Sequence, residues 1–219
     1  MTSTKARMVV LAKSWKRGGF CVAGKLLDGS DRWVRPVCDV RGGGLSALQL
    51  RLADGGEVEV LSVVDAVLGQ AMPNGVQREN CLLGDGAWRY VGAWDRRRLD
   101  ELTDAVDRLW LGPERHLAPA QAVRCDRSLA LVRVDSLIVE AGPHPYRSGY
   151  QFLGSFDYRG VGYRQWSVTA PNLCRRLESE LDRSEPFGRW ELGPAFLCLS
   201  LSQPFNGYHY KLIAEVFEA

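Results

Sequence analysis

Hydrophobic and polar residues alternate along several segments of the C-terminal half, which is the pattern of half-buried β-strands. Residues 128–139 form a run rich in leucine and β-branched residues, and the alternating runs 150–158 and 163–169 flank a glycine-containing turn. This turn joins the two runs into a predicted β-hairpin. Two more strands are predicted over 195–202 and 208–217, on either side of a turn that contains proline and glycine.

A short helix is predicted between this hairpin and the last two strands. Pro171 suits a first helical turn, and Leu173, Leu177 and Leu181 recur every four residues. The order strand, hairpin, helix, two strands is that of an OB-type barrel, in which the helix lies between strands three and four. Other small barrels share parts of this order. We predict an OB-like barrel over residues 121–219.

The N-terminal part has a similar but less regular pattern. Three predicted strands, separated by glycine-containing turn signals, cover residues 8–15, 20–27 and 32–37. Residues 45–52 form either a short helix or an irregular segment, and 57–68 is a valine-rich strand. We therefore predict a first OB-like barrel over residues 1–90.

A connecting helical segment is predicted over residues 91–120. Asp95 suits the N-cap of a helix, and Gly112-Pro113 terminates the pattern. Between them one face of the helix carries an apolar stripe: Leu99, Leu102, Val106, Leu109 and Trp110. The predicted fold class is mainly β with a few helices (α+β), as two small OB-like β-barrels in tandem joined by this segment.

Cysteine and histidine usage argues against metal and redox chemistry. The six cysteines are far apart and form no Cys-x-x-Cys pair, and none of the three histidines stands at helical ligand spacing. We predict buried thiols, no metal site and no cofactor. Apolar runs are much shorter than the roughly 18 residues of a membrane span, and the first is too short for a signal peptide. The expected location is the cytoplasm, without a membrane partner, and the oligomeric state stays open.

Positive charge is concentrated at the start of the chain. The net charge is only +2, yet residues 1–41 hold nine Lys or Arg against three Asp. In a meander of strands these cations can converge, and the Gly18-Gly19 turn lets backbone amides approach an anion such as phosphate. A glycine-rich hairpin with merely exposed charges is the alternative. The predicted phosphate-binding residues are Lys13, Arg17, Lys25 and Arg35.

Aromatic residues supply candidates for contacts with bases. On the 156–166 hairpin, rings alternate with arginines, as a single-stranded nucleic-acid surface requires, although an ordinary sheet has the same pattern. Tyr208 and Tyr210 share one strand face, where core packing competes with base stacking. Lys211 and His209 point to the other face, where they bind an anion or are simply solvated. The predicted base-binding and anion-binding residues here are Trp33, Tyr158, Tyr163, Tyr208 and Lys211.

Signatures of catalysis do not emerge. The sequence contains no Gly-x-Ser-x-Gly elbow, no His-x-x-x-His pair and no cysteine nucleophile motif, so the catalytic residues are unknown and a non-catalytic protein is favoured. Glu79-Asn80 is a polar pair that leads into an apolar run, and a helix or loop cap is its simplest interpretation.

Several motifs together resemble one known family. They are Leu-Ala-Lys-Ser to Gly-Gly-Phe-Cys-Val-Ala-Gly-Lys, Arg-Trp-Val-Arg-Pro, Glu79-Asn80, Phe-x-Tyr-x-Gly-x-x-Tyr before Thr169-Ala170-Pro171, and Leu-Ser-Leu-Ser-Gln-Pro-Phe-Asn-Gly-Tyr-His-Tyr-Lys-Leu. Across nearly the whole chain they are similar to the prokaryotic dual OB-containing domain family. The resemblance implies two tandem OB-like barrels, a link to nucleic acid and a role in systems that handle invading or modified nucleic acid. It carries over no catalytic residue, and this sequence departs from it at Ala170, where an acidic residue is expected.

Three functions follow as hypotheses. The leading one is a non-catalytic nucleic-acid-binding module for single-stranded or structured nucleic acid. The second is a protein or enzyme for a nucleotide or small anion held between the lobes, near Lys13, Arg35 and Lys211, with Glu79 or Asp157 as acid or base. The third is a protein-interaction scaffold, which requires exposed apolar patches around three tryptophans: Trp15, Trp88 and Trp94.

Overall fold

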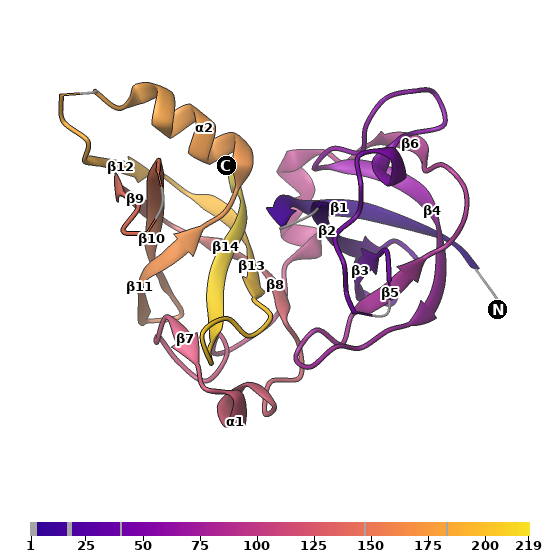
Figure 1. Ribbon diagram of the computed structural model, residues 1–219, viewed down its shortest axis with the longest axis horizontal. Helices are drawn as coiled ribbons and strands as arrows, with labels where there is room; N and C mark the ends of the chain where they lie inside the picture. Colours follow the sequence, from indigo (N-terminus) through magenta and orange to yellow (C-terminus); the bar gives the residue numbers. More distant parts are fainter. Residues whose placement is uncertain (1–3, 17–18, 40, 147, 183) are drawn as a thin grey trace. The chain divides into compact units, whose positions relative to one another are not determined.

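The chain forms two compact units. A computed structural model describes residues 4–16, 19–39, 41–146, 148–182 and 184–219 (Figure 1). Unit 1 comprises Met1–Leu102 together with Asp126–Ser128, and unit 2 comprises Thr103–Cys125 and Leu129–Ala219. Three residues of unit 1 are therefore inserted between two segments of unit 2.

Unit 1 is a closed five-stranded barrel with one additional strand. Its strands are β1 (Thr4–Lys16), β2 (Gly19–Leu26), β3 (Trp33–Val37), β4 (Ser62–Ala71), β5 (Asn80–Leu83) and β6 (Arg89–Ala93). They follow the order β1-β2-β3-β5-β4-β6, and β1 also pairs with β4, so five strands form a ring. Strands β3 and β5 run parallel and the other pairs are antiparallel. Strand order and directions are those of an OB barrel.

Alternation along β1 and β4 builds the interior of unit 1. Met8 and Val10 of β1 and Val64 of β4 are fully buried in one apolar cluster with Trp88. A register shift between Val10 and Ala12 marks a bulge in β1, and a bulge lets a long strand bend around a barrel. Between β3 and β4, where many OB barrels carry a helix, the described residues form only the short 3-10 helix η1 (Leu48–Leu50).

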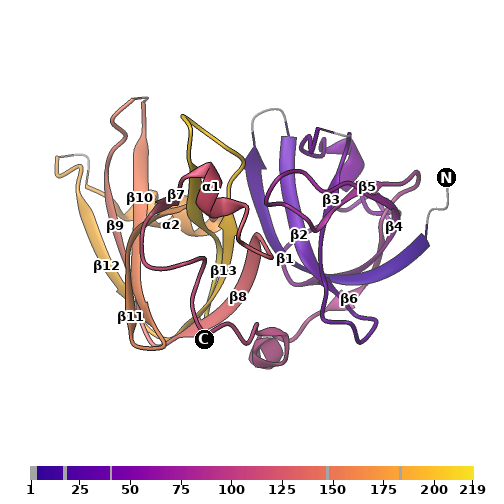
Figure 2. The ribbon, with the colours of Figure 1, turned by 90° about the horizontal axis from the view of Figure 1, so that it is seen from below.

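Unit 2 has the same strand order with a helix in place. Its elements are β7 (His116–Leu117), α1 (Pro119–Ala122), β8 (Leu129–Val134), β9 (Leu137–Pro143), β10 (Tyr150–Tyr158), β11 (Val161–Val168), α2 (Pro171–Glu180), β12 (Gly188–Leu192), β13 (Ala195–Leu201) and β14 (His209–Glu218). The sheet order is β12-β9-β10-β11-β14-β13-β8, with β11 and β14 parallel. Strand β8, the last in this order, is separated from β9 by only two residues of the chain. The two strands together therefore take the place of one long first strand (Figure 2).

The predicted fold class is confirmed: the protein is mainly β, with OB-like barrels. The hairpin at 150–168 and the helix that begins at Pro171 lie where the sequence predicts them. The strand predicted over 128–139 is two strands, β8 and β9, because the chain bends at residues 135–136. Strand β4 starts at Ser62, after Leu61 with its positive φ of 63°, and not at residue 57.

The predicted central helix is largely wrong. Only the 3-10 helix η2 (Arg96–Leu102) forms, and the helix ends there although Leu109 and Trp110 of the apolar stripe are buried. Trp110 and Leu111 both have positive φ, 39° and 68°, which a right-handed helix excludes. Leu109 and Trp110 are therefore buried within unit 2 by turns and not by a continuous helix.

Membrane-spanning helices and metal-binding clusters were both expected to be absent. No helix among the described residues is long and apolar enough to cross a membrane. The same residues contain no group of three His, Cys, Asp or Glu side chains placed to hold a metal ion.

Candidate nucleic-acid interface

The predicted cations of unit 1 already have anionic partners. Lys13 contacts Glu59 at 2.7 Å and Glu57 at 3.4 Å. Lys25 is fully buried at its side chain and lies 2.7 Å from Asp31. Arg17 is outside the described residues. Because these carboxylates neutralise Lys13 and Lys25, the two lysines present little net charge to a phosphate.

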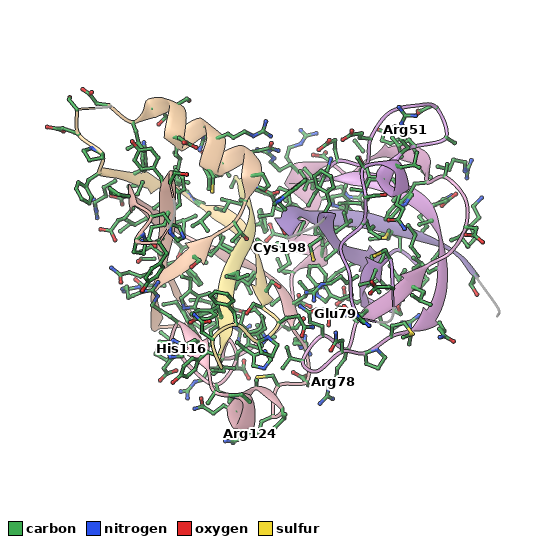
Figure 3. All side chains as sticks on the ribbon, viewed as in Figure 1. Arg51, Arg78, Glu79, His116, Arg124 and Cys198 are labelled. Carbon is green, nitrogen blue, oxygen red and sulfur yellow. The ribbon has the colours of Figure 1, made fainter. Side chains whose placement is uncertain are left out.

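Arg35 belongs to a buried polar cluster. Its guanidinium Nη2 lies 2.9 Å from Glu79 Oε1 and donates to Ser128 Oγ at 3.2 Å, while the Ser128 hydroxyl donates to the same Glu79 oxygen at 2.5 Å. The three side chains lie on β3, on the loop before β5, where Figure 3 labels Glu79, and on the inserted residues 126–128. A buried, paired guanidinium cannot also contact a phosphate in solution, so the predicted role of Arg35 does not fit. Glu79 is an ion-pair residue and not a cap.

The predicted aromatic residues divide into buried and accessible ones. Tyr163 is completely buried, its hydroxyl oxygen accepts the Leu109 N–H at 3.1 Å, and burial raises the pKa of this phenol. Its predicted stacking role is therefore wrong. Tyr158 is half-buried and donates to the Val106 carbonyl at 2.7 Å, and Trp33 is half-buried beneath Lys25, whose Nζ lies 5.6 Å from the indole centroid.

The residues at the start of β14 point in directions opposite to those expected from the sequence, where Lys211 and His209 were predicted to be solvated or to bind an anion. Lys211 and His209 point inward and are buried, whereas Tyr208 and Tyr210 face outward. Lys211 Nζ donates to the Gly112 carbonyl at 2.7 Å and lies 5.4 Å from the Trp166 ring centroid. Burial lowers the pKa of this lysine to about 8. The expected solvent-facing or anion-binding role of Lys211 is therefore wrong, because the amine lies in the core.

An aromatic cluster lies at the start of β14. It consists of His116 of β7, Phe205 and Tyr208 of the β13–β14 loop, and Tyr210 of β14. Strand β7 pairs with β14 so that His116 lies opposite Tyr210. The His116 ring contacts Tyr208 edge-on at a centroid distance of 4.5 Å and Tyr210 at 5.8 Å, and Phe205 lies 6.2 Å from Tyr210. Phe205 is 64% exposed and Tyr208 43%. Figure 3 labels His116 beside β7. Ring faces held by neighbouring rings form a platform on which bases can stack.

The aromatic cluster belongs to a loop position that OB barrels commonly use. Residues 202–208 join β13 to β14, which are strands four and five of this barrel, and OB proteins bind oligonucleotides with this loop. A two-residue turn closes it: Phe205 and Tyr208 exchange both backbone hydrogen bonds, at 2.8 and 3.0 Å. Asn206 and Gly207 form the turn with φ of 48° and 81°, values that suit asparagine and glycine. The turn fixes the two rings in place.

A smaller aromatic pair lies at the end of the β1–β2 hairpin of unit 1. Trp15 is 69% exposed and packs edge-on against its cross-strand partner Phe20 at 4.9 Å, and Lys13 Nζ lies 5.5 Å from the Phe20 centroid. The loop between strands one and two is also a binding element of OB barrels. The scaffold hypothesis requires exposed apolar patches around Trp15, Trp88 and Trp94. Trp88 is completely buried, and the Cζ atom of Arg98 lies 4.9 Å from the ring centroid of Trp94. The three tryptophans therefore form no common exposed patch.

Sequence reasoning missed His116 and Phe205. His116 reaches the aromatic cluster only through the β7–β14 pairing, which no local pattern reveals. The exposure of Phe205 could have been predicted from the sequence. An aromatic residue between Pro204 and the turn pair Asn206-Gly207 lies in a turn and not in a strand that would bury it.

Strand order, parallel pairing and loop positions define a protein built from OB barrels. The chain matches the dual OB-containing domain family over residues 6–216 and therefore belongs to that family. No curated protein and no solved structure matches the chain.

Proposed function

We propose that the protein is a non-catalytic module that binds single-stranded nucleic acid and stacks its bases on the aromatic cluster of unit 2. The observation that supports the proposal is the exposure of Phe205 and Tyr208 on the β13–β14 loop, backed by His116 and Tyr210. Base stacking on an aromatic side chain contributes about 1–3 kcal/mol per base and requires no particular sequence.

Stacking, and not charge, supplies most of the affinity in this proposal. The net charge is +2, and Lys13, Lys25 and Arg35 are each paired with a carboxylate. Each phosphate of a single strand that a protein neutralises makes the slope of log affinity against log salt more negative by about 0.7. We therefore expect a slope of only about −1 to −3 for a single-stranded oligonucleotide.

Fluorescence anisotropy with labelled single-stranded DNA, single-stranded RNA and duplexes at two salt concentrations tests the proposal. The double variant Phe205→Ala, Tyr208→Ala should bind single strands at least about 30-fold more weakly, because it loses two stacking rings. Tyr90→Ala is the matched control, since Tyr90 is a similarly exposed tyrosine, 45%, on β6 of unit 1. Absence of binding to every oligonucleotide at low salt, or equal affinities for the double variant and the control, would contradict the proposal.

A role in a prokaryotic defence or nucleic-acid-processing system extends the proposal, as does residence in the cytoplasm. The family resemblance, with its implied link to invading or modified nucleic acid, supports this extension. It predicts that base-methylated and unmethylated oligonucleotides of one sequence bind with different affinities. Incubation with magnesium should leave both intact, and cleavage would contradict the non-catalytic assignment.

A further inference from the structure

A groove crosses the outer face of the unit 2 sheet where β12 pairs with β9. Two adjoining hollows of about 490 and 270 Å³ form it, and both are lined by Glu140 and Arg189. Strand β12 is additional to the five strands of the barrel and builds one wall of the groove. The groove is distinct from the aromatic cluster, since none of the four rings lines it.

A carboxylate and a guanidinium, those of Glu140 and Arg189, line both hollows of the groove. Arg189 is the direct cross-strand partner of Glu140, which is in turn the partner of Leu153 on β10. Direct partners point to the same face of a sheet with their Cβ atoms about 5 Å apart. Within the described part of the chain, Glu140 and Arg189 form no ion pair or side-chain hydrogen bond with each other or with other residues. Their hydrogen-bonding groups are therefore available to a ligand.

Another arginine of the groove, in contrast, is paired with a carboxylate. Arg164, in the smaller hollow, contacts Asp157 at 2.6 Å and donates to the Phe156 carbonyl at 2.8 Å. A guanidinium on this surface thus pairs with a carboxylate where the backbone brings one within reach. Glu140 and Arg189 are close enough across the strands to interact and nevertheless remain apart.

A β-bulge directs a second polar group into the groove. Two residues of β11, Arg164 and Gln165, oppose the single residue Ser155 of β10, so both lie on the exposed face. Gln165 has a φ of 57°, unusual for a residue with a side chain, and its N–H donates to Ser155 Oγ at 3.0 Å. Its side chain lines the larger hollow together with Gln151.

Apolar side chains form the walls. The ring of Phe187 lies over Gly142, where a Cβ atom would come within 3.1 Å of it, so the absence of a side chain at Gly142 makes room for the ring. Phe187 is 72% exposed and Leu153 lines the same hollow. Proteins hold unstacked bases in this way: aromatic or apolar side chains cover the faces of the base, and polar groups form hydrogen bonds with its edge.

We propose that this groove binds one unstacked guanine base. Guanine presents two adjacent acceptors, N7 and O6, which match the fork of Arg189, and next to them two donors, N1–H and N2–H₂, which match the carboxylate of Glu140. No other common base offers an acceptor pair and a donor pair side by side. The inference rests on the proposed function, to which it adds a base preference.

The affinities of oligonucleotides that differ at one central base test the guanine site. Labelled oligothymidine with one central guanine should bind about tenfold or more tightly than the same strand with adenine, cytosine or thymine there, since one bidentate pair discriminates by about that factor. Glu140→Gln keeps the shape but removes the anionic acceptor, and it should reduce the preference by about fivefold or more, because only the contacts of Arg189 to N7 and O6 remain intact. Glu191→Gln changes an exposed carboxylate on β12, the strand that pairs with β9, but outside both hollows, and should retain the full preference.

Equal affinities for all four strands, or an undiminished preference in the Glu140→Gln variant, would overturn the guanine site while leaving the aromatic-cluster proposal intact. Loss of binding to every oligonucleotide would overturn both. A titration with guanosine monophosphate, followed by the side-chain amide signals of Gln151 and Gln165, identifies the source of the base. Shifts with the mononucleotide indicate a free nucleotide ligand, and shifts with the oligonucleotide alone indicate a base within a strand. Either result supports the site, and shifts with neither would contradict it.

Discussion

The loops between strands four and five of the two barrels, residues 72–79 and 202–208, have similar lengths and different roles. In unit 1 the Met72 N–H donates to the Asn80 carbonyl at 2.7 Å, and in unit 2 the Ser202 N–H donates to the Tyr210 carbonyl at 2.8 Å. Each loop contains a two-residue turn in which flanking residues exchange both backbone hydrogen bonds. The unit 1 loop leads into Glu79, which is buried against Arg35 and Ser128, whereas the unit 2 loop exposes phenyl and phenol rings.

Loops with similar backbone hydrogen bonds therefore serve different purposes in the two units. In unit 1 the segment after the turn is tied to buried partners and stabilises the barrel together with the inserted residues 126–128. In unit 2 the corresponding segment presents side chains to solvent, because the inward positions of β14 are filled by His209 and Lys211. The fold positions the loop, and the side chains on it decide between stability and binding.

The largest expected effect comes from breaking the buried ion pair of unit 1. Arg35→Met leaves the Glu79 carboxylate buried without its cation and should lower the free energy of unfolding by about 3–5 kcal/mol. Urea denaturation measures the change. Lys13→Met is the control, because Lys13 pairs with two exposed glutamates and such pairs contribute less than about 1 kcal/mol. Equal losses in both variants would contradict the stabilising role of the unit 1 cluster.

The second effect is a dependence of stability on alkaline pH that originates in unit 2. The pKa of Lys211 is about 8 in the folded chain, against 10.5 for a free lysine. Between these values the unfolded chain holds a proton that the folded chain has released. The free energy of unfolding should therefore rise with pH across this window, by about 2–3 kcal/mol. Lys211→Met should flatten the rise in urea titrations at pH 7.5, 9 and 10.5, and an unchanged rise would refute this assignment.

The smallest of these effects concerns the aromatic pair of unit 1. Trp15→Ala removes one exposed ring and should weaken binding to single-stranded DNA by about 1–1.5 kcal/mol, roughly five- to tenfold. This loss is smaller than that of the double variant in unit 2, where two rings are removed. Anisotropy titrations of the two variants side by side rank the barrels. A larger loss for Trp15→Ala would transfer the main binding surface to unit 1.

Local patterns predicted the barrels well because their hairpins and helix are encoded by nearby residues. Strand β10 lies where alternation predicts it, and α2 begins at Pro171 as expected. Strands β6 and β12 escaped notice, since segments such as Gly-Arg-Trp-Glu-Leu carry few β-branched residues and form strands only by pairing with a distant edge.

The site was harder to predict because its decisive contacts are long-range. Alternation alone assigned no charge to the interior of β14, yet the Trp166 ring and the Gly112 carbonyl create an internal place for Lys211. Tyr208, predicted from the sequence as an aromatic candidate, is exposed, but its neighbour His116 is 92 positions earlier in the sequence. The groove depends on the β9–β12 register, which no single segment specifies.

Photocrosslinking tests the central claim, base stacking on the aromatic cluster, most directly. Single-stranded oligonucleotides carrying 5-iodouracil or 5-bromouracil at successive positions would be irradiated with the protein, and the crosslinked peptides identified by mass spectrometry. We expect crosslinks to Phe205, Tyr208, Tyr210 or His116, and their loss in the Phe205→Ala, Tyr208→Ala variant. Efficient crosslinks confined to other segments, with none to these four rings, would contradict it.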